Sequence, residues 1–354
     1  MKHSNNTRQR MMAHYRAYPH LQIQDLFKYL HQSAFGCEHL VSSPAAAAQR
    51  IAAEYGGDHL TPAAVEPLDG DYSRVPISCM DGGLTAATFG RLFAASARQE
   101  PEGSAALTAK LAVARQLVAE GELPFSVAAF DDAAEHWRAQ GYGAVRHSDS
   151  FREHYRPAYR VIHNRFLPFL PLLAQLDRRL SQGKVTLAIE GGSAAGKTTL
   201  GGWLCDLYGG TLFHADDFFL QPHQRTPERL AEVGGNLDRE RLLAEVLQPL
   251  SRGEAVCYRR FDCATMSLSA AETVIPADLV VVEGAYSLHP DLAPYYDLSL
   301  FLDVTPDCQR ERILRRNSPP MAQRFFTEWI PLERRYFAET NVEQRCDMII
   351  TIDC

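Results

Sequence analysis

The sequence has no excess of basic side chains, no long apolar run and no paired cysteine motif. Its 36 Lys and Arg residues stand against 43 Asp and Glu residues, a formal net charge of −7, so the chain as a whole repels a nucleic-acid backbone. No stretch reaches the roughly 18 apolar residues that predict a membrane-spanning helix. The eight cysteines form no CxxC pair, and the first residues lead into no apolar signal core. We therefore expect a cytoplasmic protein with neither a nucleic-acid nor a membrane partner.

Length and composition predict two domains. The chain has 354 residues, of which 46% are hydrophobic, enough for two ordinary cores. One short strand is expected between residues 72 and 80. Apolar spacing of three and four predicts helices in the first half at 23–31, 45–54, 88–97, 104–120, 131–140 and 156–182, the last interrupted by prolines. We expect residues 1–180 to form a mainly α-helical domain of unknown role.

The second half alternates short apolar runs with helical segments, which is the pattern of an α/β fold. The predicted helices span 197–207, 238–250, 307–316 and 321–340. The predicted strands span 185–189, 211–214, 279–282, 298–302 and 348–352. Because these runs are apolar on both faces, they suit a parallel sheet that is flanked by helices. We expect this α/β domain to span residues 181–354.

A P-loop follows the first of these strands. Residues 191–198 read Gly-Gly-Ser-Ala-Ala-Gly-Lys-Thr, which satisfies the pattern of Gly, four residues, Gly, Lys and Ser or Thr. A strand before the loop and a helix after it aim backbone N–H groups and a helix N-terminus at phosphate oxygens. Lys197 is expected to reach the β- and γ-phosphates, and Thr198 to bind Mg²⁺. The predicted ATP-binding residues are Gly191, Gly192, Ser193, Ala194, Ala195, Gly196, Lys197, Thr198 and Thr199.

Acidic residues end two further predicted strands. Asp216 and Asp217 follow strand 211–214, and Glu283 ends strand 279–282, at the edge where α/β sheets bind their ligands. Asp216 could accept the proton of an acceptor hydroxyl, and Glu283 could hold Mg²⁺ together with Thr198. The alternative for Asp216 and Asp217 is a capping role, which short carboxylates often have.

Several segments of the second half together resemble a known family. These are GGSAAGKTT, ADDFF at 215–219, NLD at 236–238, FD at 261–262, VVVEG at 280–284 and the arginine run 310–316. They resemble uridine kinase and its relatives nicotinamide riboside kinase, phosphoribulokinase and pantothenate kinase. The resemblance covers about residues 184–354 and implies a P-loop kinase fold that uses ATP and Mg²⁺.

The resemblance also implies roles for single residues. Asp216 matches the catalytic base, and Asp238 matches a carboxylate that holds acceptor hydroxyls. Arg312 and Arg316 match lid arginines, which would close over the phosphoryl group and exclude water; the alternative for both is a solvated basic helix face. On the substrate side the family has a Tyr-Asp pair. This chain has Phe-Asp there, ending in Asp262, and Tyr258 is the candidate to supply the phenol.

Two functions are consistent with these residues. The first is a kinase that transfers the γ-phosphate of Mg·ATP to the hydroxyl of a small molecule, such as a nucleoside, nicotinamide riboside, a pantothenate-like acid or a sugar alcohol. The second is an ATP-binding regulatory protein whose slow hydrolysis needs no acceptor. An acid after the second strand and lid-like arginines favour the kinase. The sequence leaves open the acceptor, the choice between ATP and GTP, and a homo-oligomeric state.

The first half contains two polar groupings but no motif of comparable strength. His31, Cys37, Glu38 and His39 are residue types found in metal sites, but a helix end and turn around Gly36 is the preferred interpretation. The second grouping lies in residues 147–160 and is rich in His, Arg and Tyr. A helix at a domain interface is the preferred interpretation there, with an anionic effector or the kinase cleft as alternatives.

Overall fold

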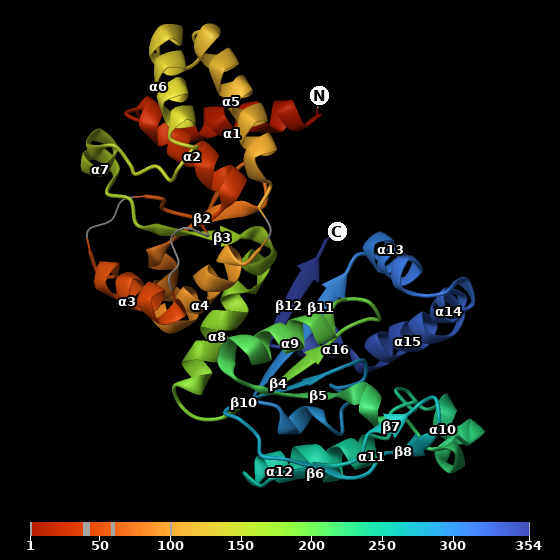
Figure 1. Ribbon diagram of the computed structural model, residues 1–354. Helices are drawn as coiled ribbons and strands as arrows, with labels where there is room; N and C mark the ends of the chain where they lie inside the picture. The colour runs from red at the N-terminus through yellow and green to blue at the C-terminus, as the bar shows by residue number, and fades with distance from the viewer. Residues whose placement is uncertain (1, 38–42, 58–60, 100, 354) are drawn as a thin grey trace. The chain divides into compact units, whose positions relative to one another are not determined.

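A computed structural model describes residues 2–37, 43–57, 61–99 and 101–353 of the chain. The chain divides into two units, Met1–Asp177 and Arg178–Cys354, which Figure 1 shows in red to yellow-green and in green to blue. In the described parts of the chain, no helix combines the length and apolarity needed to cross a membrane.

Helices make up most of the first unit. They are α1 (Lys2–Ala17), α2 (Ile23–Phe35), α3 (Pro44–Glu54), α4 (Ala86–Ala97), α5 (Gly103–Ala119), α6 (Val127–Ala139), α7 (Asp149–Tyr155) and α8 (Leu170–Leu180), with 3₁₀ turns η2 (Ile77–Gly82) and η3 (Asn164–Phe169). The helices predicted from residue 23 to residue 140 are confirmed, with ends shifted by up to four residues. The sequence did not predict α1 and α7. Ser43, Thr85, Ser126 and Ser148 each begin a helix by accepting a hydrogen bond from the N–H three residues on.

An antiparallel sheet in the first unit corrects one prediction. Its strands are β1 (Glu66–Pro67), β2 (Tyr72–Pro76) and β3 (Tyr159–His163), in the order β1-β2-β3. The strand expected between residues 72 and 80 is confirmed as β2. The helix predicted from residue 156 is wrong over β3, because Pro157 disfavours a helical Arg156 and the β-branched Val161 and Ile162 suit a strand.

A buried ionic group joins this sheet to the helices. Arg74 on β2 is 1% exposed and donates from Nε to Gln32 Oε1 (2.9 Å) and from Nη1 to Glu66 Oε2 (3.3 Å). Glu66 Oε1 lies 2.6 Å from His14 Nδ1. Burial alone would raise the pKa of Glu66, but Arg74 and His14 outweigh it and hold that pKa at about 2. The first unit therefore contains a carboxylate, Glu66, whose ionised state is stabilised by Arg74 and His14.

The grouping at residues 147–160 makes contacts inside the same unit. His147 lies between Asp25, 3.0 Å from Nδ1, and the Tyr159 hydroxyl, 2.7 Å from Nε2. Burial lowers the pKa of His147 to about 3, so the neutral ring donates to Asp25 and accepts from Tyr159. An effector role for this grouping stays a prediction. Of the first grouping, His31 and Cys37 are buried, whereas Glu38 and His39 lie outside the described residues.

The second unit contains the predicted parallel sheet. Its strands are β4 (Val185–Glu190), β5 (Thr211–His214), β10 (Leu279–Glu283), β11 (Leu298–Val304) and β12 (Met348–Ile352), paired in parallel in the order β12-β11-β4-β10-β5. Helices flank it in Figure 1. The fold class and the predicted strands are confirmed. Because β4 lies in the middle and β10 beside it, the loop after β4 and the acidic ends of β5 and β10 meet at one edge.

Two predicted helices of this unit are interrupted. The helix predicted at 238–250 consists of α11 (Arg239–Arg241), a π-helical turn η6 (Leu242–Leu247) and α12 (Gln248–Ser251). The helix predicted at 321–340 consists of α14 (Pro319–Arg324), a π turn η8 (Phe325–Trp329) and α15 (Ile330–Thr340). Each π turn ends two residues before a proline, Pro249 or Pro331. Proline has no N–H and its ring clashes with the carbonyl four residues back, which favours a wider turn at that point.

The remaining elements connect and cover the sheet. The helices are α9 (Lys197–Tyr208), α10 (Pro227–Ala231), α13 (Pro306–Arg316) and α16 (Val342–Arg345), with 3₁₀ turns η4 (Ala215–Phe218), η5 (Pro222–Gln224) and η7 (Ala293–Tyr295). Two small antiparallel pairs are β6 (Val256–Tyr258) with β9 (Glu272–Val274), and β7 (Phe261–Asp262) with β8 (Ser267–Leu268).

Candidate active site

The phosphate loop connects β4 to α9. Gly191 has φ 147°, and a Cβ at this residue would lie 2.3 Å from the carbonyl oxygen of Leu302 on the neighbouring strand β11. Only glycine fits there. Lys197, at the first turn of α9, is 9% exposed and donates from Nζ to the carbonyls of Gly191 (2.8 Å) and Gly192 (3.0 Å). The loop therefore curls around its own lysine, which places a cation among backbone groups suited to an anion.

A hydroxyl and a carboxylate meet beside the loop. Thr198 Oγ1 donates to Glu283 Oε1 at 2.9 Å, and His214 Nδ1 lies 2.6 Å from the same oxygen. His214 ends β5 directly opposite Glu283 of β10, and the hydrogen bond to Glu283 raises the pKa of His214. Within the described residues, no group of three or more His, Cys, Asp or Glu side chains could hold a metal. A hydroxyl with one carboxylate still fits Mg²⁺, which takes oxygen ligands and usually keeps water and substrate phosphates.

Asp216 is reached by solvent at the same edge. It lies in η4, directly after β5, and its side chain is exposed. Desolvation by the surrounding protein nonetheless raises the pKa of its carboxyl. Lys197 opposes this rise, whereas Glu283 adds to it. The neighbouring Asp217 is half-buried, 3.9 Å from Arg260 Nε. An accessible carboxylate within electrostatic reach of Lys197 can receive a proton from a bound hydroxyl.

Side chains of α13 and α15 contact the middle of the loop. Glu333 accepts from the backbone N–H and hydroxyl of Ser193, Gln309 donates to the Ser193 carbonyl at 2.8 Å, and Arg312 donates to the next two carbonyls at 3.2 Å each. Arg312 was predicted to lie at this site, whereas no sequence motif indicated Gln309 or Glu333. Arg316 instead lies over the Phe325 ring, with Cζ 5.5 Å from its centroid.

Three predicted substrate residues have other contacts. Asp238 is 0% exposed; it caps α11 by accepting from the Arg241 N–H (3.2 Å) and also accepts from Gln224 Nε2 (2.9 Å). Tyr258 is buried against Phe218 in the core of the unit. Asp262 is exposed in the β7–β8 hairpin, where it accepts from the Ala264 N–H. A contact between any of the three and a substrate stays a prediction.

A buried carboxylate that the sequence did not indicate organises the end of β4. Glu190 is 0% exposed. It accepts four hydrogen bonds, from the N–H groups of Gly191, Tyr286 and Leu288 and from the Tyr336 hydroxyl, at 3.0–3.1 Å. Burial raises the pKa of Glu190 to about 7. This side chain links the phosphate loop, the segment after β10 and helix α15.

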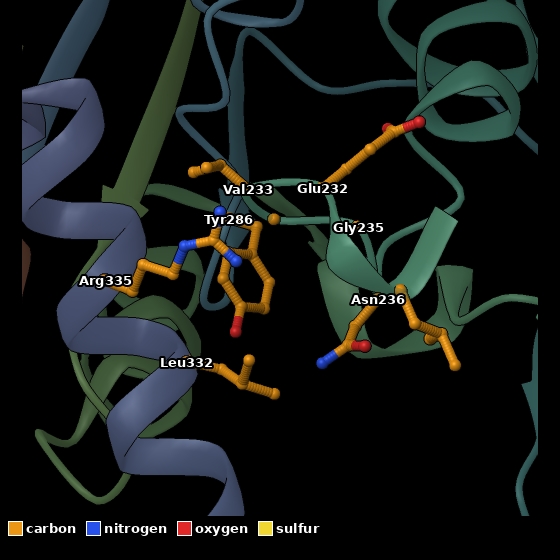
Figure 2. A pocket seen from close by; sticks show the side chains of 9 residues that line it. Glu232, Val233, Gly235, Asn236, Tyr286, Leu332 and Arg335 are labelled. Carbon is orange, nitrogen blue, oxygen red and sulfur yellow. The ribbon is translucent and has the colours of Figure 1, made fainter. Parts of the chain in front are cut away.

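A small pocket lies next to these elements. Its walls are formed by Leu230, residues 232–236, Tyr286 and two residues of α15, Leu332 and Arg335. Figure 2 shows the Tyr286 hydroxyl, the Asn236 amide and Leu332 directed toward one space, whereas the Glu232 carboxylate points away. The pocket can therefore offer a phenol, an amide and apolar surface to a small polar molecule.

Comparisons with known proteins concern only part of the chain. No family model matches it. Uridine kinase of Chlamydia pneumoniae is 30% identical over 139 residues, which are 37% of this chain and 61% of that protein. Uridine kinase-like protein 4 of Arabidopsis thaliana is 27% identical over 147 residues, which are 37% of this chain and 30% of that protein. The chain therefore spans less than two thirds of either relative.

Among solved structures, that of a possible uridine kinase from Bacillus stearothermophilus is 20% identical, with a TM-score of 0.38, over 51% of this chain and 98% of that one. A likeness at this level carries no argument about function. Over 37% of its length the chain is therefore similar in sequence to a uridine kinase and to a uridine kinase-like protein.

Proposed function

We propose that this chain, which over 37% of its length is similar to a uridine kinase and to a uridine kinase-like protein, transfers the γ-phosphate of Mg·ATP to a hydroxyl group of a small molecule. One observation carries the proposal: solvent-accessible Asp216 lies at the same sheet edge as Lys197 of the phosphate loop and the Thr198–Glu283 pair. A protein that only binds ATP does not need a carboxylate placed to take a proton from an acceptor.

Phosphate binding follows from the loop. Its backbone N–H groups and the N-terminus of α9 attract the phosphates, and Lys197 exchanges its two carbonyl partners for phosphate oxygens. Thr198 and Glu283 would hold Mg²⁺, with His214 fixing the orientation of Glu283. The ion neutralises charge on the β- and γ-phosphates. Most of the rate enhancement then comes from positioning and from fixed positive charge.

Asp216 would accept the proton of the acceptor hydroxyl. Its raised pKa improves it as a base, because a carboxyl with a higher pKa holds the transferred proton better. Arg312, already bound to two carbonyls of the loop, would add positive charge beside the transferred group. Arg316 would join it only by leaving Phe325, over which its guanidinium now lies.

We place the acceptor in the pocket beside Tyr286. Three walls of the pocket connect to the site: Tyr286 donates its N–H to Glu190, α15 carries Glu333, and the segment at Asn236 is held to η4 by the Asp238 N–H donating to the Phe218 carbonyl at 2.7 Å. Amide and phenol groups suit a hydroxylated polar molecule. Because the curated relatives are uridine kinase and a uridine kinase-like protein, nucleosides are the first acceptors to test.

Asp216→Asn tests the role of the base, with Asp217→Asn as its matched control. We expect Asp216→Asn to bind ATP as the wild type does but to lose at least about 100-fold in transfer to the best acceptor, which is the lower range for general base catalysis. Asp217→Asn should keep most of the activity. Near-normal turnover by Asp216→Asn would show that another group takes the proton.

A further inference from the structure

A carboxylate of α15 is bound to the backbone of the phosphate loop. Glu333 is 5% exposed. Its Oε2 accepts from the Ser193 N–H at 2.9 Å, and its Oε1 accepts from the Ser193 hydroxyl at 2.5 Å. These two contacts join residues 140 positions apart in the sequence, and both oxygens of the carboxylate are used.

Two further side chains bind the next groups along the loop. Gln309 donates to the carbonyl of Ser193 (2.8 Å), and Arg312 donates to the carbonyls of Ala194 and Ala195 (3.2 Å each). All three side chains come from the C-terminal helices α13 and α15. None of these contacts uses the N–H groups of residues 196–198, where the loop meets the helix N-terminus and attracts phosphate. The two helices therefore contact residues 193–195 of the loop.

The site is also tightly packed at this point. A Cβ on Gly192 would lie 3.0 Å from Gln309 Nε2 and 3.6 Å from Glu333 Oε2, so these two side chains pack closely against the loop. Burial raises the pKa of Glu333, while Lys197 and the two hydrogen bonds from Ser193 oppose the rise. Keeping a buried negative charge next to a phosphate site is costly.

We propose that Glu333 is a positioning residue for the nucleotide, which holds the phosphate loop in its binding shape through Ser193. This inference rests on the proposed function, because it assumes that the loop binds ATP. Charge-assisted hydrogen bonds of this kind are stronger than neutral ones. Without the two hydrogen bonds from Ser193 to Glu333, the loop is less ordered before the nucleotide binds. Ordering the loop then costs part of the binding free energy, which weakens nucleotide affinity.

The alternative is that Glu333 opposes nucleotide binding, and it predicts the opposite change in affinity. If Glu333 occupied a position needed by a phosphate oxygen, its removal would take away repulsion and tighten nucleotide binding. Positioning predicts weaker binding instead. The affinity of the wild type and the variants for a nucleotide therefore separates the two.

The test is calorimetric titration of the full chain with Mg²⁺ and a non-hydrolysable ATP analogue, which needs no acceptor. The variants are Glu333→Ala, Glu333→Gln, Ser193→Ala and the double variant Glu333→Ala with Ser193→Ala. Glu339→Gln is the matched control, since Glu339 lies on the same helix, is 51% exposed and pairs with Arg335. Melting temperatures without nucleotide show whether each variant is folded.

We expect Glu333→Ala to raise the Kd about tenfold, in line with the loss of a charged hydrogen bond. Glu333→Gln should lie in between, and Glu339→Gln should match the wild type. In the Ser193→Ala background, Glu333→Ala should cost less than it does alone, because one of its two hydrogen bonds is already gone. If Glu333→Ala does not fold, the Gln and Ser193→Ala variants give the same comparison.

Unchanged or tighter binding by folded Glu333 variants, with a wild type that binds the analogue, overturns the inference and leaves the proposed function intact. Fully additive effects of the two substitutions also overturn it, because Glu333 would then not act through Ser193. If the wild type itself does not bind the analogue, the proposed function fails first.

Discussion

Replacing Gly284 by alanine should destabilise the second unit and displace the acidic edge of its sheet. Gly284 follows Glu283 at the end of β10 and has φ 148°, a backbone conformation that residues other than glycine rarely adopt. A Cβ there would lie 2.6 Å from the Cβ of Ala215 and 3.3 Å from its backbone nitrogen. The strand ends that carry Glu283 and Asp216 can approach this closely only without that side chain.

The magnitude follows from two terms. Backbone strain at such a residue costs about 1–3 kcal/mol, and overpacking against a rigid neighbour costs about 1–3 kcal/mol. We therefore expect Gly284→Ala to lower the free energy of unfolding of this unit by about 2–6 kcal/mol. Gly253→Ala is the matched control: Gly253 also has positive φ, at 72°, but nothing lies within 4 Å of its Cβ position, so about 1–2 kcal/mol is expected.

Urea unfolding measures both effects. Trp137 lies in the first unit, whereas Trp203 and Trp329 lie in the second, so a Trp137→Phe background makes the fluorescence report on the second unit. Equal losses for Gly284→Ala and Gly253→Ala would refute the reasoning, because the overlap with Ala215 would then add nothing. So would a loss below about 1 kcal/mol for Gly284→Ala, which is the lower bound for strain alone.

Three further results are expected. Glu190→Gln should cost about 1–3 kcal/mol in the same assay, because the amide leaves at least one buried N–H without an acceptor; no loss would contradict the four-donor arrangement. The first unit should lose stability in acid. The pKa of Glu66 is held at about 2 in the folded unit, so the stability that ionised Glu66 contributes is present above the usual pKa near 4.5 and is lost as the pH falls toward 2. Burial lowers the pKa of His147 to about 3 in the folded unit. Below about pH 6.5 the unfolded chain therefore binds a proton at His147 that the folded unit does not, which favours unfolding. Trp137 fluorescence between pH 7 and 3, in a Trp203→Phe, Trp329→Phe background, measures this, and a pH-independent urea midpoint would contradict it. Glu283→Gln should raise the Mg²⁺ concentration needed for half-maximal transfer by about tenfold, the lower end of the effect of losing a group that supports a metal site; an unchanged requirement would remove Glu283 from that site.

The sequence predicted those parts of the fold that depend on local patterns. Apolar runs located the parallel strands, and the glycine-rich motif located the phosphate loop, because each signal is contained within a few residues. β3 was missed because residues 159–163 become a strand by pairing with β2, more than eighty residues earlier. The two π turns were missed because helical periodicity does not register the wider turn before Pro249 and Pro331.

The site was predictable to the same extent. Lys197, Thr198, Asp216 and Glu283 end strands or begin a helix, so the topology of a parallel sheet brings them to one edge. Gln309 and Glu333 reach the loop from helices more than one hundred residues later, and no motif marks them. The helix-capping contact of Asp238 was likewise not predicted, and its proposed contact with a substrate stays a prediction.

The most direct test of the central claim is consumption of ATP in the presence of Mg²⁺ and a panel of nucleosides, nicotinamide riboside, sugar alcohols and small hydroxy acids. Lys197→Ala provides the blank, because it removes the cation that the phosphate loop encloses. The proposal predicts that at least one acceptor raises turnover well above the blank and yields a phosphorylated product. ATP hydrolysis at one rate, with or without any acceptor, would contradict it and favour an ATP-binding regulatory protein.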